Sequence, residues 1–194
     1  NIFYRLFRQG VAMIELRLHG RGGQGAVTSA ELLALATISE GKYGQAFPSF
    51  GPERRGAPVV AFFRTDEKQI KIRTEITNPD LVLVLDPSIL RIVNVTAGLK
   101  DDGILIANTK YTADEIRKEL GLICKLAVVN ATKIAFAELG IPVTNTTMLG
   151  ALLKAKPIVD PDSLIVPLQE RFGRIAEKNI NAFKRAMEET VLSF

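Results

Sequence analysis

Short apolar segments alternate along the chain with segments of helical periodicity. Strand-like patterns fall at 14–18, 43–47, 59–64, 69–74, 81–85, 104–107 and 126–129. Helical patterns cover 26–40, 113–120 and most of the chain from 131 onward, ending in an amphipathic helix over 176–192. Strands that alternate with helices predict an α/β fold, a Rossmann-like three-layer doubly wound sheet that is mostly parallel.

Local signals refine this pattern. The runs at 81–85, 104–107 and 126–129 are apolar throughout, which is typical of strands covered on both faces. Segments 59–64 and 69–74 predict an antiparallel β-hairpin inserted after the second strand. Thr112 and Glu115 form a capping-box pattern. The triplet Asn145-Thr146-Thr147 predicts a helix N-cap, worth about 1 kcal/mol.

The length and the first residues suggest the domain organisation. A chain of 194 residues suits one domain with a sizeable core. Residues 1–12 lack Asp and Glu and precede Met13, which opens the first strand pattern. We interpret 1–12 as a leader from upstream translation or cloning, and 13–194 as a single domain. No apolar run approaches 18 residues, so no membrane span is expected.

Charge and rare residues exclude several function classes. The 25 Lys and Arg against 21 Asp and Glu give a net charge of +4, or +2 without Arg5 and Arg8, so nucleic-acid binding is not expected. The single cysteine, Cys124, allows no internal disulfide and is expected in the core of a cytoplasmic protein. An iron–sulfur cluster needs about four thiolates, and with one histidine, His19, a zinc site is not expected either. The chain alone is therefore expected to bind no metal.

A glycine-rich turn is the first candidate site. Gly20, Gly22 and Gly25 have the G-x-G-x-x-G spacing between a predicted strand and a predicted helix. Glycines permit positive φ, and the helix start offers free N–H groups to an anion. The candidate binding residues here are Gly20, Gly22, Gly23, Gln24, Gly25 and Thr28.

Two alternatives for this turn stay open. An NAD or FAD site needs a carboxylate at the end of the second strand, but residues 46–49 contain none and Glu40 precedes the strand. The turn can also serve only tight packing of the strand against the helix. Gln24 argues against pure packing, since it adds an amide where a ligand or a partner backbone would approach.

A charged loop at 49–58 is the second candidate. It contains Glu53, Arg54 and Arg55 between glycines and prolines. Arginine captures carboxylate or phosphate in a bidentate manner, and Glu53 could align one of the two guanidinium groups. The alternative is a solvated loop with an internal ion pair. If the second strand runs parallel to the first, this loop leaves the same sheet edge as the glycine-rich turn, and the two face one site. His19 is either an anion contact or a structural residue.

These segments together resemble the gamma subunit of pyruvate/2-oxoacid:ferredoxin oxidoreductases. The resemblance runs from Met13 nearly to the C-terminus and rests on 19–25, 45–58, 78–80, 107–109 and 142–151. It implies a non-autonomous subunit of the pyruvate synthase type. The reaction of that family is the oxidative decarboxylation of a 2-oxoacid with coenzyme A, giving acyl-CoA, CO2 and reduced ferredoxin.

The resemblance also implies partners and cofactors. Alpha, beta and delta subunits and ferredoxin are the expected partners. Thiamine diphosphate, Mg2+ and [4Fe-4S] clusters are expected mainly in the other subunits, so that this chain alone binds no cofactor. No catalytic residue is assigned to this chain; residues 20–25 and 53–55 are expected to reach the active-site region or coenzyme A. Pyruvate is the first choice of substrate. The alternatives are a branched-chain 2-oxoacid, or a free-standing dinucleotide-binding oxidoreductase.

Overall fold

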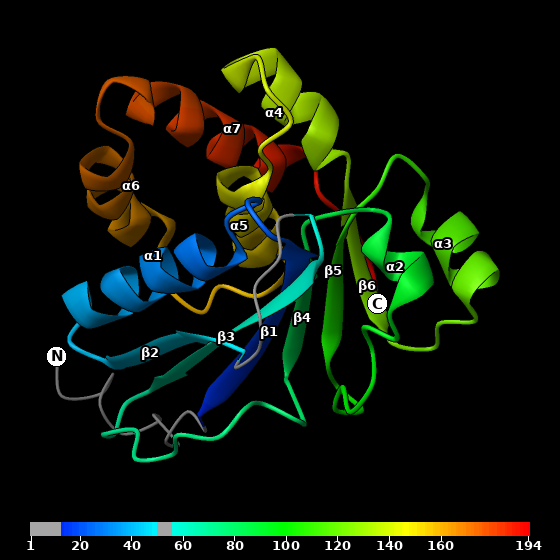
Figure 1. Ribbon diagram of the computed structural model, residues 1–194, viewed down its shortest axis with the longest axis horizontal. Coiled ribbons are helices and arrows are strands. Elements are labelled where there is room, and N and C mark those ends of the chain that lie inside the picture. The colour runs from blue at the N-terminus through cyan, green and yellow to red at the C-terminus, as the bar shows by residue number, and fades with distance from the viewer. Residues whose placement is uncertain (1–12, 50–55) are drawn as a thin grey trace, which may run out of the picture.

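A seven-stranded sheet forms the centre of the molecule (Figure 1). The computed structural model describes residues 13–49 and 56–194. The strands are β1 (Ile14–Arg21), β2 (Tyr43–Pro48), β3 (Pro58–Asp66), β4 (Leu81–Val84), β5 (Ile104–Asn108), β6 (Lys125–Val129) and β7 (Val191–Ser193). The helices are α1 (Ala26–Ser39), α2 (Ile89–Ile92), α3 (Ala113–Leu120), α4 (Ala131–Leu139), α5 (Asn145–Ala155), α6 (Ile165–Phe172) and α7 (Ala176–Glu189), with short 3-10 turns at Pro161–Leu164 and Gly173–Ile175.

The strand order is β2-β3-β1-β4-β5-β6-β7. β1, β4, β5 and β6 are parallel, with Leu18 opposite Leu83 and Leu83 opposite Ile106. The pairs β1–β3, β2–β3 and β6–β7 are antiparallel. This mixed, mostly parallel sheet confirms the predicted α/β fold class.

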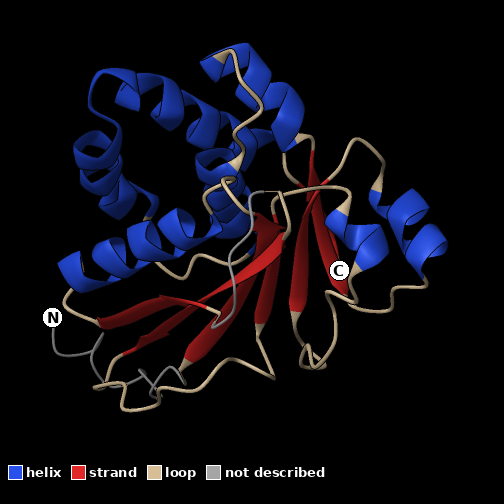
Figure 2. Ribbon diagram, in the orientation of Figure 1, coloured by secondary structure: helices blue, strands red, loops and turns tan. Residues whose placement is uncertain are grey.

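Alternating side chains divide the core into two layers. Leu16, Leu83 and Ile106 face α1 and the helices α4 to α7, which gather over one side of the sheet (Figure 2). Val82 and Leu105 belong to a smaller cluster with α2 and α3 on the other side. The central strands are therefore buried on both faces, as their continuous apolar runs predicted.

The predicted hairpin of 59–64 with 69–74 is wrong, because only its first strand forms, as β3. β3 pairs with β2 on one edge and with β1 on the other. Both edges of β3 are therefore occupied, and residues 69–74 form irregular chain with mostly exposed side chains. Arg64 of β3 anchors this segment by donating to the carbonyl of Thr74 at 2.8 Å. The hairpin is therefore β2–β3.

Two predicted helix ends are also corrected. The last helix stops at Glu189, and Val191–Ser193 forms the short edge strand β7 against β6, too short to give a period-2 pattern. α5 begins at Asn145, so its N-cap is Thr144, whose hydroxyl donates to the carbonyl of Leu85 at 3.1 Å. The capping box of α3, Thr112 with Glu115, is confirmed.

Candidate functional site

The glycine-rich turn lies at the carboxyl edge of the sheet, between β1 and β4. The chain leaves β1 for α1 on one face of the sheet and leaves β4 for α2 on the other face. Such a switch in direction opens a crevice at the carboxyl ends of the strands, where ligands of open α/β sheets bind. Gly23 and Gly25 have φ of 92° and 81°, which explains glycine at these two positions.

A small cavity of about 240 Å³ lies over the first turn of α1. Its lining comes from the turn, from the start of α1 and from β3: Arg21, Gly23, Gly25, Ala26, Val27, Thr28 and Val59. The first N–H groups of a helix have no partner within the helix, and the helix dipole adds partial positive charge there. This cavity is therefore suited to an anionic group such as a phosphate.

The side chain of Gln24 faces Asp86, which follows β4. Its Oε1 accepts from the backbone N–H of Arg21 at 2.8 Å, and its Nε2 donates to Asp86 Oδ2 at 2.6 Å. The other carboxylate oxygen of Asp86 accepts from the backbone N–H and the hydroxyl of Ser88. Burial raises the pKa of Asp86, but the hydrogen bonds from Ser88 and Gln24 outweigh it and hold that pKa below its usual value. The carboxylate is therefore ionised at neutral pH.

Arg21 ties the turn to the end of the charged loop. Its guanidinium donates to the carbonyl of Gly56 at 2.9 Å and to the hydroxyl of Ser88 at 2.6 Å, and it lies 3.5 Å from the carboxylate of Asp86. The backbone of Gly22 also pairs with Gly56 and Ala57.

The charged loop leaves the same sheet edge as the turn. β1 and β2 run in the same direction because both are antiparallel to β3. The edge that carries the turn therefore also carries the end of β2 and residues Gly56 and Ala57. This is the arrangement expected if β2 runs parallel to β1. Glu53, Arg54 and Arg55 lie outside the described residues, so their site assignment stays a prediction.

The N-terminus of α5 adjoins the same place. A Cβ at Gly25 would lie 2.7 Å from Nδ2 of Asn145, so the first residue of α5 lies directly against the N-cap of α1. Asn145 is buried, and its Oδ1 has no hydrogen-bond partner among the residues that the structure describes. Thr28, in the first turn of α1, accepts from Arg171 of α6 at 3.2 Å.

Sequence reasoning missed Arg21, Asp86 and Asn145 as members of this region. Arg21 occupies a variable position of the glycine motif, and Asn145 resembled a helix cap. Asp86 had one usable signal, because a polar residue directly after a buried parallel strand lies at the ligand edge of the sheet.

His19 lies on the other side of β1 from α1 and is buried. Arg17 Nε donates to its Nε2 at 3.1 Å. Burial, and then the charge of Arg17, lower its pKa from 6.5 to about 4. A neutral histidine that accepts from arginine supports the structural interpretation over the anion contact.

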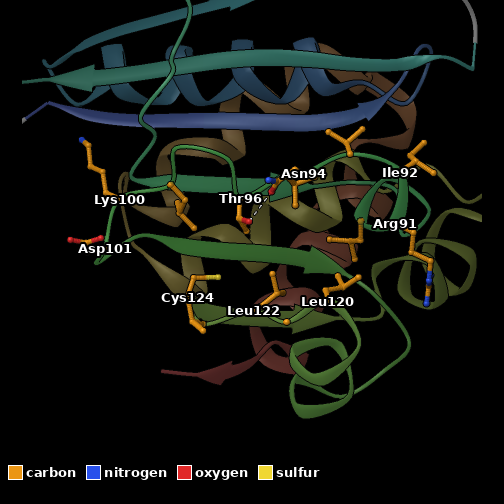
Figure 3. A pocket seen from close by; sticks show the side chains of 15 residues that line it. Arg91, Ile92, Asn94, Thr96, Lys100, Asp101, Leu120, Leu122 and Cys124 are labelled. Carbon is orange, nitrogen blue, oxygen red and sulfur yellow. Dashed lines mark hydrogen bonds between the residues drawn. The ribbon is translucent and has the colours of Figure 1, made fainter.

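A larger groove of about 880 Å³ opens between α2 and the chain after α3 (Figure 3). Lys100 and Asp101 lie at one end and Arg91 at the other, where Arg91 pairs with Glu119 at 2.7 Å. Cys124 is only partly buried rather than fully in the core, and burial raises the pKa of its thiol. The groove is therefore large, but it contains no reactive thiol.

The described part of the chain contains neither a metal-binding cluster nor a membrane-spanning helix. Within residues 13–49 and 56–194, no three His, Cys, Asp or Glu side chains are arranged to hold a metal ion. No helix in the same described ranges is long and apolar enough to cross a membrane.

Comparison with known proteins gives consistent relatives. The family model for pyruvate ferredoxin/flavodoxin oxidoreductase matches residues 15–189. The "Pyruvate/ketoisovalerate oxidoreductases common subunit gamma" of Pyrococcus abyssi is 55% identical over 180 residues, covering 92% of this chain and 97% of the relative. Pyruvate synthase subunit PorC of Methanothermobacter thermautotrophicus is 49% identical over 180 residues, covering 91% of this chain and 96% of the relative.

A solved structure indicates the same family as these sequence relatives. The crystal structure of pyruvate oxidoreductase subunit PORC from Thermotoga maritima matches with a TM-score of 0.83 and 37% identity, covering 94% of this chain and 99% of that one. The predicted family is thus confirmed by sequence and by structure. The chain belongs to the pyruvate ferredoxin/flavodoxin oxidoreductase family, as a subunit of the gamma type.

Proposed function

We propose that this chain is the gamma subunit of a coenzyme A-dependent 2-oxoacid:ferredoxin oxidoreductase and that its glycine-rich turn binds the phosphates of coenzyme A. The observation that carries the second part is the cavity over the first turn of α1, with Arg21 in its lining. Coenzyme A carries both a diphosphate and a monophosphate, which suit the free N–H groups of a helix start. The chain binds and orients the acyl acceptor, and the acid, base and redox steps belong to groups elsewhere in the complex.

The sheet geometry favours this over a free-standing dinucleotide enzyme. In a Rossmann site the strand beside β1 is parallel and ends in the carboxylate that binds the ribose. Here antiparallel β3 occupies that place, and β2 ends at Pro48. Glu40 is engaged elsewhere, with Lys42 and with the backbone of Asp160.

Pyruvate is the first proposed substrate, converted to acetyl-CoA and CO2 while ferredoxin is reduced. A branched-chain 2-oxoacid is the second candidate, because the name of the Pyrococcus abyssi relative joins pyruvate with ketoisovalerate. A subunit common to two enzymes would leave the choice of 2-oxoacid to its partners. Substrate preference is then a property of the assembled complex.

Alpha, beta and delta subunits are the proposed partners within a cytoplasmic complex. Apolar side chains exposed along the β6–β7 edge support burial in an assembly. Ile123 is fully exposed, and Phe194 is 66% exposed just beyond Ser193, which pairs with Leu126. Thiamine diphosphate, Mg2+ and [4Fe-4S] clusters are proposed to reside with those partners, since this chain has one cysteine.

A matched pair of variants tests the coenzyme A site. Val59 and Val60 are both half-buried on β3, but Val59 lines the cavity and the alternation of the strand turns Val60 to the opposite face. In the reconstituted complex, Val59→Phe should raise the apparent KM for coenzyme A by at least about tenfold, as expected when a binding group is displaced. The kcat and the KM for pyruvate should stay within about twofold of the wild-type values. The substitution removes only binding energy that coenzyme A gains equally in the ground state and in the transition state.

Val60→Phe should leave all three constants near those of the wild type. An unchanged KM for coenzyme A in the Val59→Phe complex would refute the proposed site. Micromolar binding of NAD(H) by the isolated chain, with turnover of a substrate, would instead favour the free-standing enzyme.

The charged loop gives a separate test of the predicted site residues 53–55. Arg54→Ala and Arg55→Ala should each lower the activity of the reconstituted complex while the isolated subunit stays folded by circular dichroism. Full activity in both variants would reduce the loop to a surface feature.

A further inference from the structure

Gln24 and Asp86 form a hydrogen-bonded link between the two loops of the crevice. Gln24 sits between Gly23 and Gly25, the two turn residues with positive φ. Its amide spans from the backbone N–H of Arg21 to the carboxylate of Asp86, with bonds of 2.8 and 2.6 Å. The link thus fixes the middle of the turn to the segment after β4.

The polarity of this link is determined at both ends. The N–H of Arg21 can only donate, and the carboxylate of Asp86, ionised as its hydrogen bonds require, can only accept. Gln24 must therefore present its oxygen to Arg21 and its nitrogen to Asp86. A glutamate at position 24 would place a second carboxylate against that of Asp86. An asparagine at position 86 that keeps its oxygen on the N–H of Ser88 would place one amide nitrogen against another.

The link has little direct access to a ligand. Both ends of the Gln24 amide are engaged within the chain, and Asp86 also accepts from Ser88. The cavity over α1 is lined by the neighbours of Gln24, namely Gly23, Gly25 and Arg21, rather than by Gln24 itself. The pair can thus influence a ligand through the shape of the turn.

We propose that Gln24 and Asp86 are positioning residues that hold the glycine-rich turn in the conformation that accepts the phosphates of coenzyme A. This inference rests on the proposed function, since it needs the acceptor to bind at the turn. It assigns the effect to a directional hydrogen bond rather than to the size or charge of either side chain. A directional bond can be reversed, and this gives a test that general destabilisation would not mimic.

The test exchanges the donor and the acceptor. Gln24→Glu and Asp86→Asn are prepared separately and together in the reconstituted complex, with pyruvate, coenzyme A and ferredoxin as substrates. In the double variant the carboxylate introduced at position 24 accepts from the N–H of Arg21 and from the amide introduced at position 86. That amide keeps its oxygen as an acceptor for Ser88. The double variant also keeps the net charge of the wild type.

Each single variant should raise the KM for coenzyme A by at least about tenfold, the effect of mispairing a hydrogen bond to a charged group. The kcat and the KM for pyruvate should change by less than about twofold. The double variant should return the KM for coenzyme A to within about threefold of the wild type. If a single variant fails to assemble, the double variant decides alone, because it must both assemble and bind normally.

The outcomes separate this inference from the proposed function. Suppose that Val59→Phe raises the KM for coenzyme A. The positioning role alone is then overturned if Gln24→Glu and Asp86→Asn leave that KM unchanged, or if the double variant does not return it toward the wild-type value. If Val59→Phe and both exchanges leave that KM unchanged, the coenzyme A site falls and the positioning role falls with it. Additive losses in the double variant would also overturn the positioning role.

Discussion

Gly25 and Gly150 are both tightly surrounded, but for different reasons. Gly25 caps α1 with a φ of 81°, a conformation that other residues rarely adopt, and its neighbour is the side chain of Asn145. Gly150 lies inside α5 with ordinary helical geometry, and a Cβ there would collide with the backbone carbonyl of Phe183 in α7. The first glycine is required by backbone conformation and the second by helix packing.

The surroundings of the two glycines differ in the same way. Around Gly25 the polar groups of Arg21, Gln24 and Asp86 form a network at the sheet edge. Around Gly150 the core of α5 and α7 is largely apolar, with Leu149 and Phe183 buried. The polar network around Gly25 fits the proposed binding region, whereas the apolar surroundings of Gly150 explain close packing of α5 against α7.

The largest expected effect is on stability at the helix–helix contact. Gly150→Ala should lower the free energy of unfolding by about 3 kcal/mol, because α7 must move away from α5. Chemical denaturation of the isolated subunit measures this. Lys154→Ala, at an exposed position of the same helix, should change it by less than about 0.5 kcal/mol. A similar loss in both variants would contradict close packing as the reason for Gly150.

A smaller effect is expected at the turn. Gly25→Ala should cost about 2 kcal/mol and Gly23→Ala about 1 kcal/mol, since both strain a positive φ but only Gly25 faces Asn145. Unfolding midpoints and the KM for coenzyme A of the complex should both change in Gly25→Ala. Adding Asn145→Ala should relieve part of the stability loss in that variant. If Asn145→Ala restores no stability, the backbone conformation alone explains why position 25 requires glycine.

At neutral pH the smallest effect concerns His19, which lies on β1 and on the face away from α1. Its pKa is lowered from 6.5 to about 4, so the unfolded chain binds the proton more readily than the folded one. The stability from neutral His19 is therefore complete above pH 6.5 and is lost as the pH falls toward 4. The resonance of this single histidine should titrate near pH 4, and His19→Gln should remove this part of the pH dependence. Titration near pH 6.5 would contradict the buried, neutral state.

The sequence predicted most of the fold because its signals were local. Apolar runs such as 81–85 located the parallel strands, and Thr112 with Glu115 located a helix start. The strand at 69–74 failed because pairing depends on which sheet edges are free, which no local pattern contains. β7 was missed because three residues show no period.

The site was predicted only in part. The glycine spacing located the turn, since positive φ restricts the residue type at those positions. Arg21, Asp86 and Asn145 could not be assigned, because their roles depend on segments far apart in the sequence meeting at one sheet edge, as Gly25 and Asn145 do. Whether residues 53–55 join them stays a prediction.

Equilibrium binding without turnover shows whether the glycine-rich turn binds coenzyme A. Desulfo-coenzyme A, which lacks the reactive thiol, would be titrated calorimetrically into complexes carrying wild-type, Val59→Phe or Val60→Phe gamma subunit. A coenzyme A site at the turn predicts a dissociation constant at least about tenfold higher for Val59→Phe and equal values for the other two complexes. Equal affinity in all three complexes would contradict it.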